Sequence, residues 1–407
     1  MSKTLDFHPK DWFKQLFGFE ENPKTASGMF DLFEEDDKVP KDFPSSKITL
    51  LKSKVNKKTY NSGNFQLRSS DKGSFPNLKN RKNGKLNIIH GTGKQTKNYE
   101  LIDILSMQSL PTFNGATYLA ASNFNCLEFV SCAQTAENGV TGYYADPTQG
   151  PYAALACGPS IVYRNYFVKH HDHIGQIGKE INLLEKTGIP VVHGYAMIKK
   201  DTDIVPEQPN SYLHSFSKLF SKFFKKKEEL VIPDKFKDPK NWQVGVHRNC
   251  EVVLTRNREG MFSFAPPGRV SHHVYAAAFN FAYDVTLTDL TAAVSVEMLT
   301  AEYRATILAA WENSLLYPDK PGSMKLSLTL LGGGVFANPY DVICKAIEAN
   351  IELIRESGLD VYITCFNDQT FNDVMRYLGE AVNKTGGKIY NADDDENCKE
   401  LLVLHDI

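Results

Sequence analysis

The stretch that decides the fold runs from Lys325 to Pro339: Lys-Leu-Ser-Leu-Thr-Leu-Leu-Gly-Gly-Gly-Val-Phe-Ala-Asn-Pro. Its first seven residues predict a buried strand, and three consecutive glycines follow that strand directly. Asn338 and Pro339 are typical of a helix start, because a proline there gives up an N–H that the helix would leave unbonded anyway. A strand, a glycine loop and a helix in this order indicate a parallel sheet covered by helices.

The segments around this stretch continue the alternation of strand and helix. Before it, the sequence predicts a strand over 270–279 and a helix from 297 to about 316. After it, the sequence predicts a helix that ends at Gly358 and a strand over 361–366. This order predicts an α/β fold, namely a three-layer α/β/α mixed sheet with insertions.

An earlier part of the chain supplies another strand of the same kind. Residues 117–121 form a short apolar run between glycine and asparagine, which is typical of a buried strand. An alanine-rich stretch and a second apolar stretch follow, and each begins at a proline, Pro151 or Pro159. Proline at a first helical position favours a helix, so we expect two helices here. Residues 48–89 are rich in turn residues and are expected to form edge strands.

The composition of the 407 residues is that of a folded globular protein. Apolar residues make up 42% and charged residues 23%, which excludes a wholly disordered or collagen-like chain. The 46 Lys and Arg residues against 48 Asp and Glu residues leave a formal net charge of −2. No overall field therefore attracts nucleic acid, and we expect no nucleic-acid partner.

The cysteines and the N-terminal residues bear on the compartment. The 7 cysteines show neither a CxxC pair nor a Cys/His zinc spacing, so we expect free thiols. Residues 170–173, His-His-Asp-His, are not expected to hold a metal, because adjacent side chains point to different faces. The first residues lack the apolar core of a signal peptide, and no window reaches about 18 apolar residues. We expect no transmembrane segment and a reducing cytoplasm, of the protein's own cell or of a host cell.

Two segments fall outside the alternation of strand and helix. Residues 1–47 combine aromatic side chains with an acidic run, and we interpret them as an N-terminal arm with short helical pieces before a catalytic domain of residues 48–407. Residues 199 to about 243 are rich in lysine and predict an insertion. Its apolar residues 219, 220, 223 and 224 fit a basic amphipathic helix that would contact a membrane surface or a partner. A solvated lysine-rich loop is the alternative that we favour.

Two predicted loops follow the carboxyl ends of strands, where open parallel sheets bind their ligands. The first is the glycine loop at 332–338. Three glycines before a helix leave backbone N–H groups unshielded, which suits a phosphate, and a diphosphate would fit. The alternative is a tight turn packed against the sheet. The P-loop pattern and GxGxxG are both absent.

The second loop spans 122–150 and carries Asn123, Asn125, Glu128, Asp146 and Gln149. Side-chain amides suit sugar hydroxyls, and a carboxylate can orient or deprotonate a water molecule. Beside a phosphate-binding loop, this combination predicts a site for a nucleotide sugar. Asn and Asp are also common loop residues, so a structural role is the alternative for each of them.

The two loops resemble the ligand loops of macrodomains. The string Ala-Ala-Ser-Asn-Phe-Asn at 120–125 is similar to the loop that holds the distal ribose in that family. The string from 331 to 338 is similar to the loop that cradles the diphosphate and sets an aromatic ring near the ribose. Residues 149–158 resemble the helix that follows the first loop in macrodomains. The fuller string, from 123–128 through 146–151 to 161–166, resembles a larger branch related to poly(ADP-ribose) glycohydrolase, which includes bacterial effector hydrolases that release ADP-ribose from arginine. The adjacent catalytic glutamates of the glycohydrolases are missing, which argues against cleavage of poly(ADP-ribose).

The resemblance implies a hydrolase that removes ADP-ribose from a modified protein side chain, above all from arginine, without a cofactor or metal. It places the catalytic carboxylates among Glu128, Asp146 and Asp284, the last of which follows the strand at 270–279. The partners it implies are ADP-ribose and an ADP-ribosylated protein. Two alternatives are a reader that binds ADP-ribose without turnover, and an interaction protein that works through the arm and the insertion. The expected ligand-binding residues are Asn123, Asn125, Gln149, Gly150, Gly332, Gly333, Gly334, Val335, Phe336 and Asn338.

Overall fold

A mixed sheet forms the centre of the fold in a computed structural model that describes residues 6–36, 47–76, 78–205 and 231–403. Within these residues the sheet has eight strands in the order β17-β5-β16-β15-β6-β14-β11-β4. The first six are parallel, whereas β11 runs antiparallel to both of its neighbours. The bounds are β4 Asn64–Ser69, β5 Lys85–His90, β6 Thr117–Ala121, β11 Gln243–Glu251, β14 Val270–Ala276, β15 Lys325–Leu328, β16 Asp360–Cys365 and β17 Ile389–Asn391.

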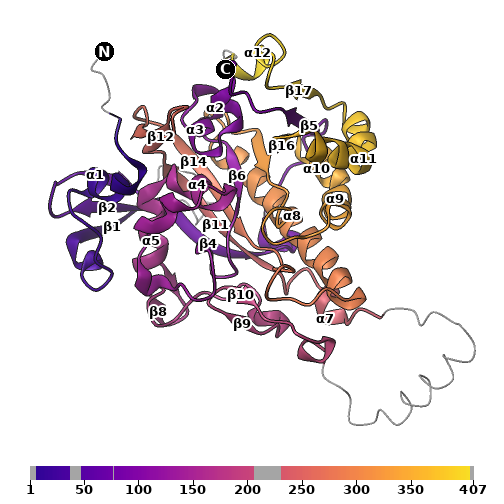
Figure 1. Cartoon of the computed structure of the whole chain (residues 1–407), viewed down its shortest axis with the longest axis horizontal. Coiled ribbons are helices and arrows are strands. Elements are labelled where there is room, and N and C mark those ends of the chain that lie inside the picture. Colours follow the sequence, from indigo (N-terminus) through magenta and orange to yellow (C-terminus); the bar gives the residue numbers. More distant parts are fainter. Residues whose placement is uncertain (1–5, 37–46, 77, 206–230, 404–407) are drawn as a thin grey trace, which may run out of the picture.

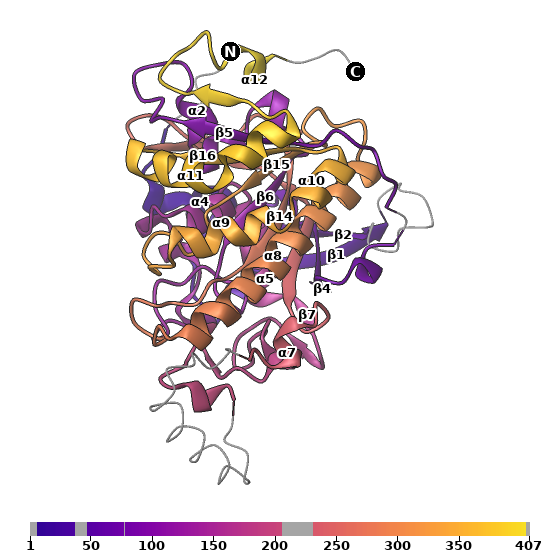
Figure 2. The same cartoon turned by 90° about the vertical axis from the view of Figure 1, so that its right-hand side faces the viewer.

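Helices cover both faces of this sheet. Figure 1 shows α2 to α5 on one side of it and α8 to α11 on the other, and Figure 2 shows α8 to α11 in front of the strands. The predicted three-layer α/β/α architecture is therefore confirmed. None of the described helices is long and apolar enough to cross a membrane. The bounds are α2 Tyr99–Ile102, α3 Ile104–Met107, α4 Gln149–Leu155, α5 Gly158–Tyr166, α8 Asp289–Leu316, α9 Tyr340–Glu348, α10 Ile351–Ser357 and α11 Asp368–Thr385.

Helix α8 is the central helix of the second face and is buried along most of its length. Large, fully enclosed side chains of this helix, such as Tyr303 and Trp311, alternate with buried alanines. The helix begins at Asp289, eight residues before the predicted start, because the Thr288 side chain accepts a hydrogen bond from Thr291 N. Such an N-cap satisfies a backbone donor that the helix itself leaves unbonded.

Several predicted strands and helices are confirmed, and others differ from the prediction in their bounds, number or position. The strand at 117–121 is β6 with the predicted bounds, and the predicted strands at 270–279 and 325–331 end three residues early. The single helix expected before Gly358 is two helices, because the Asn350 side chain donates to Ala346 O at 2.9 Å where α9 ends. The expectation of edge strands in 48–89 is wrong for β5, which lies between β17 and β16 with Leu86, Ile88 and Ile89 fully buried.

The N-terminal segment forms a small unit beside α5 (Figure 1). It holds α1 (Trp12–Phe17) and a three-stranded antiparallel sheet of β1 (Phe30–Asp36), β2 (Lys47–Ser53) and β3 (Thr59–Asn61). A Cβ atom added to Gly158, the first residue of α5, would lie 2.8 Å from side-chain atoms of Trp12 and Leu16. The segment is thus packed closely on the main unit, and the predicted boundary at 47 falls at the start of β2, which pairs with β1.

The flanks of the predicted insertion belong to the packed structure. Phe236 and Trp242 are buried, and Trp242 Nε1 donates to Phe236 O at 2.8 Å. Ile204 on the other flank is buried as well. The predicted amphipathic basic helix falls in 206–230, outside the described residues.

The sheet opens between β6 and β15. These strands pair only at Leu326 with Thr117 and at Ser327 with Tyr118, whereas β6 stays paired with β14 up to Ala121. The side chain of Gln149 takes the place of the missing strand. Its Nε2 donates to Leu119 O at 2.8 Å, and its Oε1 accepts from Ala121 N at 2.8 Å. One amide side chain therefore bonds the two backbone groups, an N–H and a carbonyl oxygen, that β6 exposes where β15 turns away.

We expect Gln149→Ala to lower the free energy of unfolding by about 1–2 kcal/mol, because it leaves two backbone groups of β6 without their partner. Chemical denaturation measures the loss. The control is Gln369→Ala, since Gln369 is exposed and bonds only to Asp373 on the surface of α11; it should cost less than about 0.5 kcal/mol. Equal losses in both variants would contradict the role given to Gln149.

Candidate functional site

A cavity of about 670 Å³ lies where β6 and β15 part. The carboxyl ends of β6, β15 and β16 face it, so the two loops predicted from the sequence meet there. No Lys, Arg or His is among the described residues that line it. The lining residues are Ala121–Asn123, Glu128–Val130, Ala145, Asp146, Thr148–Pro151, Tyr195, Ala278, Thr329–Phe336, Tyr340, Thr364, Phe366, Asn367 and Thr370.

The glycine loop offers backbone donors to this cavity. Gly333 N donates to Leu330 O at 2.9 Å, so this amide is already bonded within the turn. The N–H groups of Gly334, Val335 and Phe336 have no acceptor among the described residues, and neither has that of Gly332. Helix α9 begins a few residues later, which adds the positive end of its dipole. The loop therefore provides donors for an anion without using a charged side chain.

The shape of the loop depends on Gly332 and Asn338. Gly332 has φ +76°, and a Cβ atom there would lie 2.4 Å from Asn338 Nδ2 and 2.5 Å from the Ala278 side chain. The buried Asn338 side chain donates to Phe279 O at 2.7 Å and accepts from Ser295 Oγ at 3.3 Å. We expected Asn338 to bind ligand, but its amide is committed to holding the loop and it is not among the lining residues.

The other two glycines face different surroundings. A Cβ atom on Gly333 would lie 3.0 Å from the Ile343 side chain and 3.2 Å from the Tyr340 ring, so this residue faces α9. A Cβ atom on Gly334 would have no heavy atom within 4 Å. Gly334 therefore has open space around it, and Gly333 does not.

The amide residues of the other loop have separate positions. Asn123 lines the cavity, and its Nδ2 donates to Phe129 O at 2.8 Å. Asn125 is fully buried and is not among the lining residues; its Nδ2 donates to Glu180 Oε2 at 3.1 Å and its Oδ1 accepts from Leu127 N at 3.1 Å. Asn125 thus shapes the loop from behind instead of facing a ligand.

Gln149 and Gly150 close the loop and begin α4. Both line the cavity, but the amide of Gln149 is occupied by the edge of β6. A Cβ atom on Gly150 would lie 1.7 Å from Ala121 O, so only glycine lets the first turn of α4 lie against β6. The residues that were expected to bind ligand here instead join the helix to the strand.

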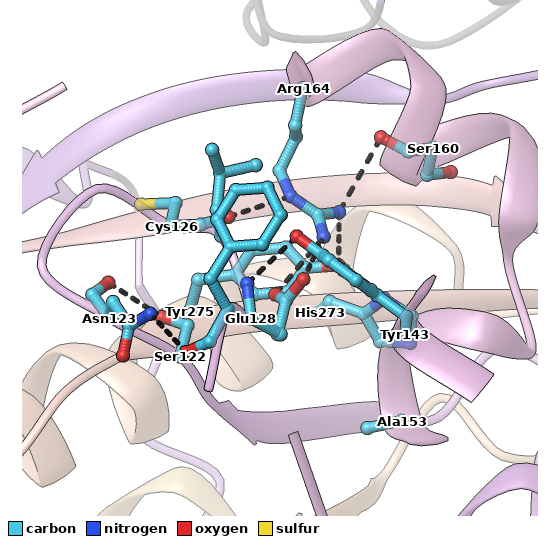
Figure 3. Close-up of polar contacts among 12 residues, drawn as sticks. Ser122, Asn123, Cys126, Glu128, Tyr143, Ala153, Ser160, Arg164, His273 and Tyr275 are labelled. Atoms are coloured by element: carbon cyan, nitrogen blue, oxygen red, sulfur yellow. Dashed lines mark hydrogen bonds and ion pairs between the residues drawn. The ribbon is translucent and has the colours of Figure 1, made fainter. Parts of the chain in front are cut away.

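Glu128 forms a buried ion pair with Arg164 (Figure 3). Both side chains are fully enclosed, and the two Glu128 oxygens accept from the same guanidinium nitrogen at 3.1 and 3.0 Å. Arg164 also donates to Cys126 O and lies over the Tyr275 ring at 3.7 Å. Burial raises the pKa of Glu128 to about 7, although the Arg164 guanidinium opposes this change.

This pairing changes the role of Glu128. We expected a catalytic carboxylate, but both of its oxygens are taken by Arg164 on α5, and Tyr143 Oη accepts from Glu128 N at 2.8 Å. Arg164 was not among the residues expected at the site. It is the one charged residue of α5 and lies in its last turn, and such a cation points to a buried acidic partner, because an unpaired buried charge is costly.

Asp146 is the carboxylate that the structure brings to the cavity. It follows the 3₁₀ helix Thr141–Ala145, is half-buried, and accepts from Thr148 N at 3.0 Å. No ion pair involves it among the described residues. Asp284 is not among the lining residues, and its side chain accepts from Asn280 Nδ2 at 2.8 Å. Of the three expected carboxylates, only Asp146 therefore lines the cavity with an oxygen that has no protein partner.

Aromatic side chains complete the cavity. The rings of Phe336 and Tyr195 lie 5.9 Å apart, and Tyr195 Oη donates to Phe129 O at 2.6 Å. Phe366 at the end of β16 is 52% exposed although it is large and apolar. The sequence analysis missed Tyr195 and Phe366. For Phe366, the signal was its place at the carboxyl end of a predicted strand.

The histidines in the described part of the chain do not form a metal site. No group of three or more His, Cys, Asp or Glu side chains within the described residues is arranged to hold a metal. His272 and His273 lie inside β14 and are fully buried, and burial lowers the pKa of each to about 3. All 7 cysteines are free thiols, as the sequence predicts.

The comparisons with known proteins find similarity among solved structures only. No family model and no curated protein sequence matches the chain. Poly(ADP-ribose) glycohydrolase from Deinococcus radiodurans in complex with ADP-ribose aligns with 78% of this chain and 94% of its own, at 10% identity and a TM-score of 0.37. The apo form aligns over 34% of this chain and about half of its own, 55%, at 16% identity and a TM-score of 0.26.

Two macrodomain structures are also similar. A mutant macrodomain from Oceanobacillus iheyensis aligns with 76% of this chain and 98% of its own, at 13% identity and a TM-score of 0.30. The Trypanosoma brucei macrodomain in complex with ADP aligns with 77% and 75%, at 12% identity and a TM-score of 0.29. These are the two groups that the sequence resembles. At such scores they transfer neither a substrate nor an activity to this chain.

The buried Glu128 predicts a pH dependence of stability. Burial raises the pKa of Glu128 from 4.5 to about 7 in the folded chain. Between these two pH values, the folded state therefore binds more protons than the unfolded state. The free energy of unfolding that Glu128 contributes must then fall as the pH rises through this window. In Glu128→Gln the group cannot titrate. We expect the stability of wild type relative to the variant to fall by about 1–3 kcal/mol between pH 4.5 and pH 8.

Urea denaturation of both proteins at a series of pH values measures this difference. Titrations of other groups cancel in the comparison. A difference that widens toward high pH would show that the ion pair with Arg164 outweighs burial, and would contradict the prediction.

Proposed function

We propose that this chain is an ADP-ribosyl hydrolase, which binds ADP-ribose in the cavity and hydrolyses its N-glycosidic bond to a protein side chain, above all to arginine. The observation that carries this proposal is that unbonded N–H groups of the glycine loop and the carboxylate of Asp146 line one cavity, and no described residue of its lining is cationic. This arrangement suits a ligand with an anionic end and a reacting end that carries a positive charge.

The diphosphate would lie on the glycine loop. The N–H groups of Gly332, Gly334, Val335 and Phe336 are the available donors, and the start of α9 adds favourable potential. Gly333 serves a different purpose from the one expected, because its N–H is bonded to Leu330 O. Donors fixed in the backbone bind phosphate without the conformational entropy that long cationic side chains lose.

The sugar nearest the reaction would lie between the two loops. Asn123 offers its Oδ1 to a ribose hydroxyl, because its Nδ2 is held by Phe129 O. The rings of Tyr195 and Phe336 provide an apolar wall beside it. Asn125 supports this loop from behind, and Glu128 lines the cavity with both oxygens held by Arg164; both are proposed to act without touching the ligand.

Asp146 is the proposed catalytic residue. It would take a proton from a water molecule that attacks C1′ of the ribose, while the bond between C1′ and the guanidine nitrogen breaks. The proton taken from the water then passes to that nitrogen, which restores the carboxylate of Asp146. The products are ADP-ribose and an unmodified arginine. Before the reaction, the modified guanidinium is a cation, and a carboxylate in a cavity without cationic side chains favours it. An ester on glutamate has no such charge.

A reader that binds ADP-ribose without turnover is the second candidate. The observation that favours it is that Arg164 takes both oxygens of Glu128, so only one unpaired carboxylate lines the cavity. Incubation of the purified protein with ADP-ribosylated protein separates the two functions. Release of free ADP-ribose supports the hydrolase, and stable binding without release supports the reader.

We expect Gly334→Val to weaken the binding of free ADP-ribose at least about tenfold, because its side chain would occupy the open space beside the unbonded N–H groups. The φ angle of Gly334 is one that valine can adopt, so the fold should persist. Titration calorimetry measures the affinity. The control is Gly28→Val, which also adds a side chain in open space but lies in the N-terminal segment. Unchanged affinity in a folded Gly334→Val protein would rule out the phosphate assignment.

We expect Asp146→Asn to lower the rate of release from ADP-ribosyl-arginine about 100-fold, or about 2–3 kcal/mol of transition-state stabilisation, with little change in affinity for free ADP-ribose. The reason is that Asp146 acts on the water and the guanidinium, whereas the glycine loop holds the diphosphate. Asp284→Asn is the matched comparison, since Asp284 does not line the cavity. Wild-type rates in Asp146→Asn, or release from a glutamate ester alone, would contradict the proposal.

A further inference from the structure

The carboxylate of Glu21 in the N-terminal segment contacts the loop that leads to Asp146. Val140 N donates to its two oxygens at 2.9 and 2.8 Å, and Thr141 N and Thr141 Oγ1 each donate at 2.6 Å. Tyr166 Oη donates as well, at 2.7 Å. No ion pair links Glu21 to a Lys or Arg in the part of the chain that the structure describes. The carboxylate is therefore held by neutral donors from two distant segments.

The loop is shaped to receive this carboxylate. Gly139 has φ +77°, and a Cβ atom on it would lie 2.7 Å from Glu21 Cδ, so a larger residue would displace the carboxylate. Beside it, the fully buried Trp12 donates from Nε1 to Thr141 O at 2.9 Å. The N-terminal segment thus bonds both the N–H and the carbonyl oxygen of Thr141.

Thr141 is the first residue of the 3₁₀ helix Thr141–Ala145, and Asp146 follows this helix directly. Asp146 N donates to Tyr143 O at 3.2 Å, so this short helix fixes the backbone of the carboxylate. From the same helix, Tyr143 Oη accepts from Glu128 N at 2.8 Å. The helix is therefore bonded to Glu21 at its start and to the Asn123 loop through Glu128. Its other end leads into Asp146, which lines the cavity.

We propose that Glu21 is a positioning residue that sets the place of Asp146 in the cavity through the 3₁₀ helix Thr141–Ala145. This inference rests on the proposed hydrolase function. It gives the N-terminal segment a specific task, which is to supply an anion that orders the loop carrying the reacting carboxylate. A displacement of about 1 Å in a catalytic group can cost about 100-fold in rate. A weakened contact at Glu21 is therefore expected to lower the rate, although Glu21 does not line the cavity.

The substitution that tests this is Glu21→Gln. Glutamine keeps the size of the side chain, but its NH₂ group would face the N–H donors of Val140 or Thr141 and could not accept from them. The neighbouring Glu20 provides the control, because it is exposed and pairs only with Lys14 at 2.8 Å. Glu20→Gln removes the same charge one residue away without touching the loop.

We expect Glu21→Gln to lower kcat at least about tenfold while KM and the affinity for free ADP-ribose change less than about threefold, because the diphosphate site is untouched. Glu20→Gln should stay within about twofold of wild type in each quantity. Thermal unfolding of both variants confirms that they are folded. Hydrogen exchange should show faster exchange of the Val140 and Thr141 amides in Glu21→Gln alone.

A double-mutant cycle shows whether Glu21 acts through Asp146. In the Asp146→Asn protein, Glu21→Gln should lower kcat less than about twofold further, because the group that it positions is gone. An undiminished tenfold loss in that background, or a loss confined to KM, would overturn the inference. If wild type releases no ADP-ribose, the proposed function fails. Hydrogen exchange alone then tests whether Glu21 orders the loop. Unchanged exchange of the two amides would then contradict its role.

Discussion

The separation of β6 from β15 is the constraint on which the rest of the structure depends. Two parallel strands that stayed paired to their ends would leave no cavity between their loops, and a strand that lost its neighbour would leave unbonded backbone groups. Gln149 resolves this conflict, because its amide bonds both exposed groups of β6. The glycine loop is then free to turn away from the sheet, and the 670 Å³ cavity forms at a point where three strands end.

The distribution of charge follows from this geometry. The described lining has backbone donors from the glycine loop and the carboxylate of Asp146, which forms no ion pair, and the Arg164 guanidinium is enclosed with Glu128. In the proposed reaction, a positively charged side chain in the lining would compete with the modified guanidinium for Asp146. Backbone N–H groups bind the anionic part of a ligand without that competition, which is why the two halves of the cavity remain chemically distinct.

Much of the fold could be predicted from the sequence, because it depends on local pattern. The apolar run at 117–121 and the strand before the triple glycine needed only burial and turn chemistry, and the meeting of their loops followed from parallel strands. The residues that fix the site could not be predicted in the same way. Gln149, Arg164 and Glu21 act through partners 28 to 145 positions away, and Asn338 is a loop residue whose buried amide no local pattern reveals.

The central claim is that the backbone N–H groups of Gly332, Gly334, Val335 and Phe336 bind the diphosphate of ADP-ribose. The most direct test is an amide NMR titration of the ¹⁵N-labelled full chain with free ADP-ribose. The account predicts that these four resonances move together with one dissociation constant, while the amide of Gly333, already bonded to Leu330, moves less. Resonances that stay in place in this loop while others shift elsewhere would contradict it.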